Sequence, residues 1–402
     1  MKLLLVHRYI RPDTPGYAHM LYLMGKRFAA EGHDVTIFSA QPSYNDVYDG
    51  PKLPSREQVD GMTIIRTPLF RENKKSTFWR SVNFLIFSLS LFWHAVFRLT
   101  PYDLMTVTTF PPALMGWVAR KIQFLRDTKY VYHCMDLYPE IAMRSGIIKR
   151  KWLMDLAGAV DKRNCECATE VVVLSEDMAD TLRDRGVKNP NVSVINNFII
   201  DQVDPKFELP ESLQANPDRF RVLFAGNMGR FQSLETIVAA AQELSHRDQI
   251  EFLFVGSGVM VDELKKQSSD LIGHTVSFHP YMPIHEVMSL IATSHLGIVS
   301  LSPGIIEAAY PSKTMSYLEA GCKLLALVEP ESELADLIEH EHLGVVVEEY
   351  SATAVAGAIE QQYEQWLQQG YDRDKVKHAG RANFSQEVIL DRWIELLNRL
   401  KA

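Results

Sequence analysis

The chain has few cysteines, no apolar run long enough to span a bilayer and no excess of positive charge. Its 402 residues include only four cysteines, which excludes a small domain stapled by disulfides. Cys165 and Cys167 are one residue apart and no second pair accompanies them, so a structural zinc site is not expected. The net charge of −8 argues against a general nucleic-acid binder. With 47% hydrophobic and 23% charged residues, the composition indicates a folded globular protein.

The first sixteen residues, MKLLLVHRYIRPDTPG, lack the features of a signal peptide. Their apolar run covers only Leu3–Val6, and charged residues follow at once. A secretory signal needs a longer apolar core. We therefore expect a cytoplasmic protein with reduced thiols.

Charge is distributed unevenly along the chain. Residues 1–205 carry 26 basic and 22 acidic side chains, whereas residues 206–402 carry 16 and 28. At roughly 150 residues per domain, the length predicts two or three domains. The charge asymmetry favours two domains with different partners.

Short β-rich runs alternate with helical patterns along the chain, which predicts an α/β protein with doubly wound parallel sheets. In the first half the expected strands are Lys2–Val6, Val35–Ser39, Met62–Arg66, Leu104–Val107, Tyr130–His133, Glu170–Leu174 and Val192–Ile195. In the second half they are Arg221–Ala225, Glu251–Val255, Val276–Phe278, Gly297–Ser300, Lys323–Val328 and Gly344–Val347.

The stretch Asp201–Phe220 has three prolines and no hydrophobic period, so we expect a linker there. Two Rossmann-like domains are therefore expected, at residues 1–204 and 205–385. An amphipathic helix at 386–402 either closes the second domain or crosses back to the first. Ligands of such domains bind where strands end, which directs attention to the loops after the strands.

Two glycine-containing turns follow strands of the second half. Phe224–Arg230 (FAGNMGR) contains Gly226, Asn227 and Gly229, and a helix opens near Ser233. Glycine lets backbone N–H groups approach an anion, and Arg230 offers a bidentate phosphate contact. The alternative is a tight turn without a ligand. Phe254–Gly258 (FVGSG) lacks the third glycine of the dinucleotide fingerprint, which disfavours a nicotinamide cofactor.

The segment Ala309–Gly321 (AYPSKTMSYLEAG) predicts a helix that begins near its proline. Ser312 and Lys313 then lie at the positive end of the helix and form a second phosphate seat. Ser316 and Glu319 are three residues apart and share a face that can hydrogen-bond a ribose. An ordinary capped helix is the alternative.

Polar residues also follow strands in the first half. His133 and Asp136 belong to Tyr132–Glu140 (YHCMDLYPE), where acid, base or sugar-hydroxyl roles are chemically possible. The alternatives are a buried core histidine and an aspartate that caps a turn. The loop before Gly16 is basic and offers a backbone approach to a ligand.

The most apolar segment is Arg80–Arg98 (RSVNFLIFSLSLFWHAVFR). Between its arginines it has no charge apart from His94, yet it is shorter than the ~20 residues that span a bilayer. On a helical wheel five of its polar side chains fall on one stripe: Arg80, Asn83, Ser90, His94 and Arg98. The segment is either a buried core helix or a helix lying in the membrane plane, where nearby cations would attract anionic lipids.

Together these motifs resemble glycosyltransferase family 4, of the group 1 glycosyltransferases, which have GT-B architecture with two Rossmann-like domains facing a cleft. The similarity is greatest to the subgroup that builds bacterial surface polysaccharides such as O-antigen and capsule. The matches keep their order along nearly the whole chain and include RPDTPG, YDLMTVTTFPPALMG, DLYPE, VVVLSEDM, INNFIID, FAGNMGRFQSLETIVAAA, FLFVGSG, PSKTMSYLEAG and LADLIEHEHLGVVV.

The resemblance implies transfer of a hexose or N-acetylhexosamine derivative, with retention, from a nucleotide diphosphate sugar, UDP rather than GDP. It implies no metal and no cofactor. His133 and Asp136 would lie near the transferred sugar as catalytic residues. The residues expected to bind the donor are Gly16, Gly226, Asn227, Gly229, Arg230, Ser312, Lys313, Ser316 and Glu319.

The apolar helix indicates a saccharide acceptor carried on polyprenyl diphosphate at the inner face of the cytoplasmic membrane. The residues expected to contact membrane or acceptor are Arg80, Phe84, Phe92, Trp93 and Arg98. Two other functions remain open: a UDP-sugar 2-epimerase of GT-B fold and a non-catalytic nucleotide-sugar-binding protein. An epimerase would need no acceptor and no apolar, basic helix.

The sequence departs from the family at several positions. The Glu-x7-Glu pair of the family is missing, because its positions fall on Ala308 and Ser316. Glu307 is one residue out of register, and Glu319 is one helical turn late. Smaller departures are Pro15, Gln232 and His295. The missing pair, unlike the smaller departures, bears on how the donor sugar and the ribose are held.

Overall fold

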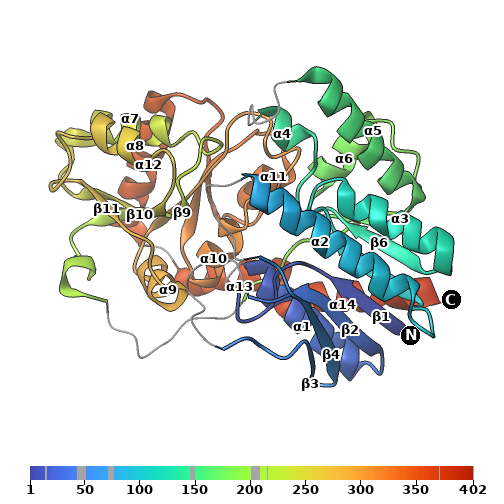
Figure 1. The fold of residues 1–402 in the computed structure, drawn as a ribbon. Helices are drawn as coiled ribbons and strands as arrows, with labels where there is room; N and C mark the ends of the chain where they lie inside the picture. The colour runs from blue at the N-terminus through green and yellow to red at the C-terminus, as the bar shows by residue number, and fades with distance from the viewer. Residues whose placement is uncertain are drawn as a thin grey trace. The chain divides into compact units, whose positions relative to one another are not determined.

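The computed structural model describes residues 1–13, 16–42, 51–70, 77–144, 150–200, 209–214, 216–370 and 372–401 (Figure 1). The chain divides into two compact units, one formed by residues 1–200 and 389–402 and the other by residues 201–388. Each unit is an α/β domain built on a largely parallel sheet, which confirms the predicted fold class. Residues 201–208 and 215 of the predicted linker lie outside the described residues, and its remainder contains a short 3-10 turn at Glu211–Leu213 and the first residue of β9, Phe220.

The sheet of the first unit has eight strands in the order β3-β4-β2-β1-β5-β6-β7-β8. They are β1 (Lys2–Val6), β2 (Asp34–Ala40), β3 (Arg56–Val59), β4 (Met62–Thr67), β5 (Leu104–Thr108), β6 (Lys129–His133), β7 (Glu170–Val173) and β8 (Val192–Val194). The central strands are short apolar runs because both faces of a parallel sheet are covered. Strand β3 is antiparallel to β4 and forms an edge that the sequence analysis did not predict.

The helices of the first unit are α1 (Gly16–Ala30), α2 (Thr77–Val96), α3 (Leu114–Arg126), α4 (Glu140–Arg144), α5 (Lys151–Cys167), α6 (Glu176–Asp184) and most of α14 (Gln386–Lys401). Helix α14 begins in the second unit and continues into the first, where Trp393 packs in the core with Leu3 and Phe28. In the described ranges, no helix combines the length and the apolar character needed to cross a membrane.

The sheet of the second unit has six parallel strands in the order β11-β10-β9-β12-β13-β14. They are β9 (Phe220–Asn227), β10 (Ile250–Ser257), β11 (Val276–His279), β12 (Leu296–Ser300), β13 (Lys323–Leu327) and β14 (Gly344–Val346). Its helices are α7 (Leu234–Glu243), α8 (Val261–Gln267), α9 (Ile284–Ala292), α10 (Lys313–Glu319), α11 (Glu333–His340), α12 (Ala352–Gln369) and α13 (Arg373–Phe384), with short 3-10 turns at Glu211–Leu213 and Leu244–His246.

The strand order of each sheet reverses direction beside its first strand in the chain. In the first unit β1 lies between β2 and β5, and in the second β9 lies between β10 and β12. Ligands of doubly wound sheets bind at such switch points, beyond the carboxyl ends of the strands. The loops after β1, β5, β9 and β12 are therefore the places where a site is expected.

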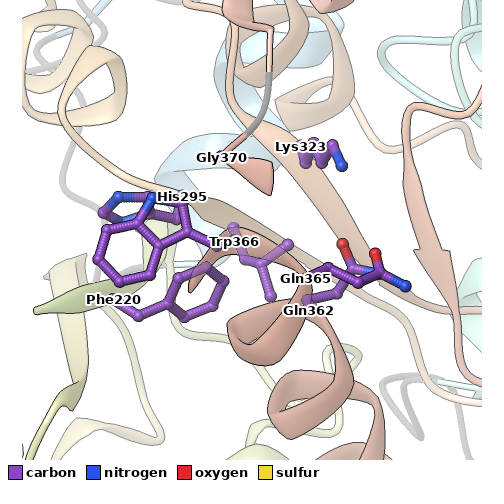
Figure 2. Close-up of a pocket in the computed structure, with 8 residues that line it drawn as sticks. Phe220, His295, Lys323, Gln362, Gln365, Trp366 and Gly370 are labelled. Carbon is purple, nitrogen blue, oxygen red and sulfur yellow. The ribbon is translucent and has the colours of Figure 1, made fainter. Parts of the chain in front are cut away.

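A hollow opens at the amino ends of the strands of the second sheet, away from the switch point (Figure 2). It lies at the amino ends of β9, β12 and β13, next to Phe220, His295 and Trp366. The ring centroids of Phe220 and His295 are 4.9 Å apart, and those of His295 and Trp366 are 4.7 Å apart. Burial lowers the pKa of His295 to about 4, so this histidine is a neutral aromatic packing residue. We do not take this hollow as the functional site.

Candidate functional site

The carboxyl ends of β9 and β10 meet backbone to backbone at their glycines. Gly226 has a φ of +134°, which residues other than glycine rarely adopt. A Cβ placed on Gly256 would lie 2.0 Å from the Gly226 carbonyl oxygen, and one on Gly258 would lie 2.1 Å from the Met228 carbonyl oxygen. These turns therefore require glycine at three positions, and they expose backbone where an anion can approach.

Lys313, the first residue of α10, reaches across to the same loop. A Cβ placed on Gly226 would lie 2.8 Å from Lys313 Cε and 3.6 Å from its Nζ. The ammonium lies 4.4 Å from the ring centroid of Phe224. Burial lowers the pKa of Lys313 to about 8, and no carboxylate of the described residues pairs with it. The structure thus brings together Gly226 and Lys313, two of the residues predicted to bind the donor.

Tyr317 holds α10 against β9, a role that the sequence analysis missed. Its hydroxyl accepts a hydrogen bond from the Ala225 N–H at 2.9 Å and lies 3.4 Å from the Leu223 carbonyl oxygen. The ring occupies the space above Gly297, where a Cβ would lie 2.4 Å from Tyr317 Cγ. An aromatic residue one helical turn after Lys313 was the available signal.

The rest of the predicted phosphate loop lies at the surface. Asn227 and Arg230 are exposed, and the Gly229 N–H donates to Gln232 Oε1 at 3.2 Å. Gln232, one of the departures from the family, therefore already satisfies a backbone donor that a phosphate would otherwise use. Ser312 is exposed at the start of α10 and makes no side-chain capping bond.

Ser316 and Glu319 differ sharply in their surroundings. Ser316 is half-buried, whereas the Glu319 side chain is only 2% exposed. Arg381 of α13 binds both carboxylate oxygens of Glu319, with Nε 3.0 Å from Oε2 and Nη2 on Oε1. Glu319 therefore connects α10 to α13, and we do not retain a ribose contact for it in the proposal below.

In the first unit His133 ends β6 inside an aromatic cluster and is only 3% exposed. Its Nδ1 lies 3.1 Å from the Tyr17 hydroxyl, and its ring centroid is 5.1 Å from that of Trp393. Burial, with a smaller contribution from the charge of His7, lowers the pKa of His133 to about 3. This surrounding is that of a buried core histidine, the alternative considered from the sequence.

Asp136 lies three residues beyond His133 in a different environment. It is half-buried, and loss of solvation raises its pKa to about 6. Glu140, further along this segment, is bound by Arg185, whose Nη1 also donates to Asp161 Oδ2 at 2.7 Å. These ion pairs anchor the segment that carries Asp136.

Gly16 begins α1 and is exposed. A Cβ there would meet nothing within 4 Å, so space does not require glycine at this position. Residues 14–15 of the same loop are outside the described ranges. Within those ranges, no group of three or more His, Cys, Asp and Glu side chains is arranged to hold a metal ion.

Helix α2 turns part of its polar stripe, Asn83 and His94, toward the protein. Asn83 donates to the Phe70 carbonyl at 2.9 Å and accepts from the Phe70 N–H at 3.0 Å. His94 Nε2 lies 2.9 Å from the Tyr102 hydroxyl, to which Arg98 Nη1 donates at 2.5 Å. One face of α2 is therefore buried and the opposite, apolar face is exposed. The alternative of a helix wholly buried in the core is wrong, and a position in the membrane plane stays a prediction.

The residues predicted to contact membrane or acceptor are divided between these faces. Trp93 is 66% exposed and Arg80 is also exposed, whereas Phe92 and Arg98 are half-buried. Phe84 turns inward, where its ring centroid lies 5.1 Å from that of Phe110 and 5.3 Å from the Arg8 guanidinium carbon. Phe84 thus packs beside the carboxyl ends of β1 and β5.

Comparison with known families gives matches over most of the chain. The glycosyl transferase 4-like domain matches residues 16–197, and the domain of glycosyl transferases group 1 matches residues 205–382. The putative colanic acid biosynthesis glycosyl transferase WcaI of Escherichia coli (strain K12) is 24% identical over 382 residues, covering 90% of this chain and 92% of WcaI. The probable glycosyltransferase WbjE of Pseudomonas aeruginosa is 25% identical over 58% of this chain and 59% of its own length.

Solved glycosyltransferase structures share the fold. Sucrose-phosphate synthase from Thermosynechococcus elongatus superposes with a TM-score of 0.77 at 18% identity, over 100% of this chain and 99% of that one. Anabaena HepE, solved in complex with UDP and glucose, gives a TM-score of 0.71 at 14% identity, over 99% and 100% of the two chains. These likenesses confirm the GT-B fold class.

Proposed function

The chain belongs to the glycosyltransferases that combine a 4-like domain with a group 1 domain, and we propose on this basis that it transfers a sugar from a nucleotide diphosphate donor. The transferred group is a hexose or an N-acetylhexosamine derivative, and the nucleotide is UDP rather than GDP. The observation that carries the proposal is the position of Lys313 against Gly226 at the switch point of the second sheet.

Lys313 and the glycine loop suit the diphosphate of such a donor. The ammonium is half-buried and unpaired with any described carboxylate, so its field is weakly screened. The diphosphate gains negative charge when the bond to the sugar breaks, because the bonding electron pair stays on its oxygen. Donors fixed before the reaction stabilise this developing charge, and this is the role that we assign to Lys313 and the backbone at Gly226. Exposed Arg230 and Ser312 add polar contacts at the same edge. No metal is needed in this proposal, because the protein supplies the positive charge.

For the transferred sugar we assign the catalytic role to Asp136 rather than to His133. With a pKa of about 6, Asp136 is ionised at pH 7 but remains basic enough to accept a proton or to hold a sugar hydroxyl. His133 stays neutral and buried, so we assign it a positioning role through its contact with Tyr17. Retention at the anomeric carbon is part of this proposal.

The acceptor in this proposal is a saccharide on polyprenyl diphosphate, and the pathway is bacterial surface polysaccharide synthesis. The relative WcaI is named for colanic acid biosynthesis, and the structural neighbours WaaG and WaaB are named for lipopolysaccharide. The exposed apolar face of α2 supports a lipid-linked acceptor and a peripheral position at the inner face of the cytoplasmic membrane. An epimerase would have no use for that face.

A thermal-shift panel with UDP, GDP and their sugars, with and without EDTA, tests the donor site. A ligand at 100-fold its Kd adds about 2.7 kcal/mol to the free energy of unfolding. We expect stabilisation by UDP that survives EDTA in the unchanged protein and is weakened in Lys313→Ala. Absence of a shift with every nucleotide would contradict the proposal. A transferase should release UDP from a UDP-sugar only when the acceptor is present. An epimerase should convert the UDP-sugar without any acceptor, so this assay separates the two.

A further inference from the structure

Most of the exposed large apolar side chains lie in one part of the first unit. Among the described residues nineteen such side chains are exposed, and fourteen of them lie between residues 70 and 156. Concentrations of this kind mark a binding surface, because single exposed apolar residues are otherwise scattered over a protein.

Eleven of these fourteen side chains lie on three neighbouring helices. Helix α2 packs on α3, and α3 packs on α5 (Figure 1). We define the α2–α3–α5 face by its outward residues Leu85, Leu89, Trp93, Trp117, Phe124 and Trp152. Phe124 is 84% exposed, although a residue of its size is normally covered.

The exposed apolar residues of α2 are not core residues that have turned outward, because the helix has a separate set of buried residues. In α2 the residues that face the sheet, such as Phe87 and Leu91, are already buried, and the polar Asn83 has its hydrogen bonds inside. A helix that is apolar on both sides needs an apolar environment on both sides. The outer side of α2 therefore requires a second partner.

Charge indicates which partner this is. Helices α2, α3 and α5 together carry seven basic side chains and three acidic ones, Asp155, Asp161 and Glu166. Exposed Lys121 lies on the outward side of α3, with Nζ 5.7 Å from the ring centroid of Trp117. Tryptophan beside lysine suits the boundary between lipid headgroups and acyl chains. Pairing with a second copy would instead bring the same cations face to face.

We propose that the α2–α3–α5 face docks in the plane of an anionic lipid bilayer, its aromatic side chains entering the headgroup region. This inference rests on the proposed function, because a lipid-linked acceptor is the reason for the protein to bind a membrane. It extends the docking surface from one helix to three. Within the first unit, the inner side of α2 brings Phe84 to Arg8, directly after β1. One helix thus separates the lipid surface from the strand ends where this unit would hold an acceptor.

Vesicle flotation with the full chain tests the proposal. Vesicles of phosphatidylglycerol and phosphatidylethanolamine are compared with phosphatidylcholine alone, at low and high salt. We expect binding to the anionic vesicles, weakened by salt, and a loss of about tenfold or more in Trp93→Ser/Phe124→Ser, since each change removes an inserted aromatic. Lys121→Glu on α3 should also weaken binding to the anionic vesicles, because it reverses a positive charge on the face. The matched control is Leu367→Ser on α12, 60% exposed in the second unit, which should bind like the unchanged protein.

Two results would overturn the proposal. One is equal flotation of the double variant and the unchanged protein. The other is a dimer by light scattering that the double variant converts to a monomer, without vesicle binding by either. UDP thermal shifts on the same samples keep the two proposals apart. Flotation without a UDP shift counts against the donor site alone, and a UDP shift without flotation counts against the docking face alone.

Discussion

The Tyr317 hydroxyl accepts the backbone N–H of Ala225 at 2.9 Å, and this bond connects α10 to the last buried residue of β9. Lys313 lies one turn earlier on that helix, and Gly226 is the next residue on that strand. The two parts of the proposed phosphate site are therefore fixed to each other by a side chain that need not touch the ligand.

Tyr317→Phe is expected to lower stability and to weaken UDP binding. It leaves a buried N–H without its acceptor, which costs about 1–3 kcal/mol. Thermal unfolding measures the first effect, and calorimetric titration with UDP measures the second. Tyr281→Phe, at an exposed position of the same unit, is the control and should change neither. A Tyr317→Phe protein of unchanged stability would show that the bond is unimportant.

Gly226→Ala is expected to disturb Lys313 directly. The new Cβ would lie 2.8 Å from Lys313 Cε, at a φ of +134° that alanine disfavours. Backbone strain of this kind costs about 1–3 kcal/mol, and UDP binding should weaken with it. Gly357→Ala is the matched control, because a Cβ in that helix meets nothing within 4 Å. Since alanine is the better helix former, we expect Gly357→Ala to stabilise the protein by about 0.5–1 kcal/mol.

Lys313→Ala should raise the Kd for UDP by about 10- to 150-fold, which corresponds to the 1.5–3 kcal/mol of a hydrogen bond to a charged group. Lys266→Ala, which removes an exposed lysine of α8, should leave the Kd unchanged. Calorimetric titration of both variants gives the comparison. Equal affinities in the two variants would remove Lys313 from the donor site.

UDP affinity should also fall as the pH rises from 8 toward 10. The pKa of Lys313 is lowered to about 8, so the free protein loses the charge above that pH and binding must first restore a proton. The logarithm of the association constant then falls by up to about one per pH unit. Lys313→Arg keeps its charge throughout this range and should give a flat profile, even if its affinity is lower. A flat profile in the unchanged protein would contradict this assignment.

Asp136→Asn should lower kcat by about 100- to 10,000-fold without unfolding the protein. Burial raises the pKa of Asp136 to about 6, so the carboxyl takes up a proton near pH 6 and activity should decline as the pH falls through that value. His133 cannot produce this decline, because its pKa is about 3. The pH dependence of kcat/KM, compared with that of the exposed control Asp155→Asn, provides the measurement. An acid limb that persists in Asp136→Asn would assign it to another group.

The strands could be predicted from the sequence because buried parallel strands are short apolar runs between turns. Every expected strand is present, with its ends within two residues of the prediction. Strand β3 was missed because REQV has no apolar alternation, and its residues are exposed or half-buried at the edge of the sheet. Strand β3 forms because it pairs with β4, and the local sequence of β3 does not indicate this pairing.

The side-chain surroundings at the candidate site were predicted less well. A helical wheel shows that Asn83 and His94 share a stripe of α2, but it does not show which stripe faces the sheet. The orientation of α2 follows from the hydrogen bonds of Asn83 to the Phe70 backbone and of His94 to the Tyr102 hydroxyl. His133 is likewise buried by Trp393 from the far end of the chain, a contact with no local signal.

Helix α14 places Trp393 in the core of the first unit, although residues 201–388 form the second. A growing chain therefore leaves the ribosome with nearly all of the first unit in place but with the positions beside Phe28 and His133 uncovered. The second unit is continuous, so all of it precedes the last segment of the first unit in the chain. In the order of biosynthesis, the unit that starts first is the one that finishes last.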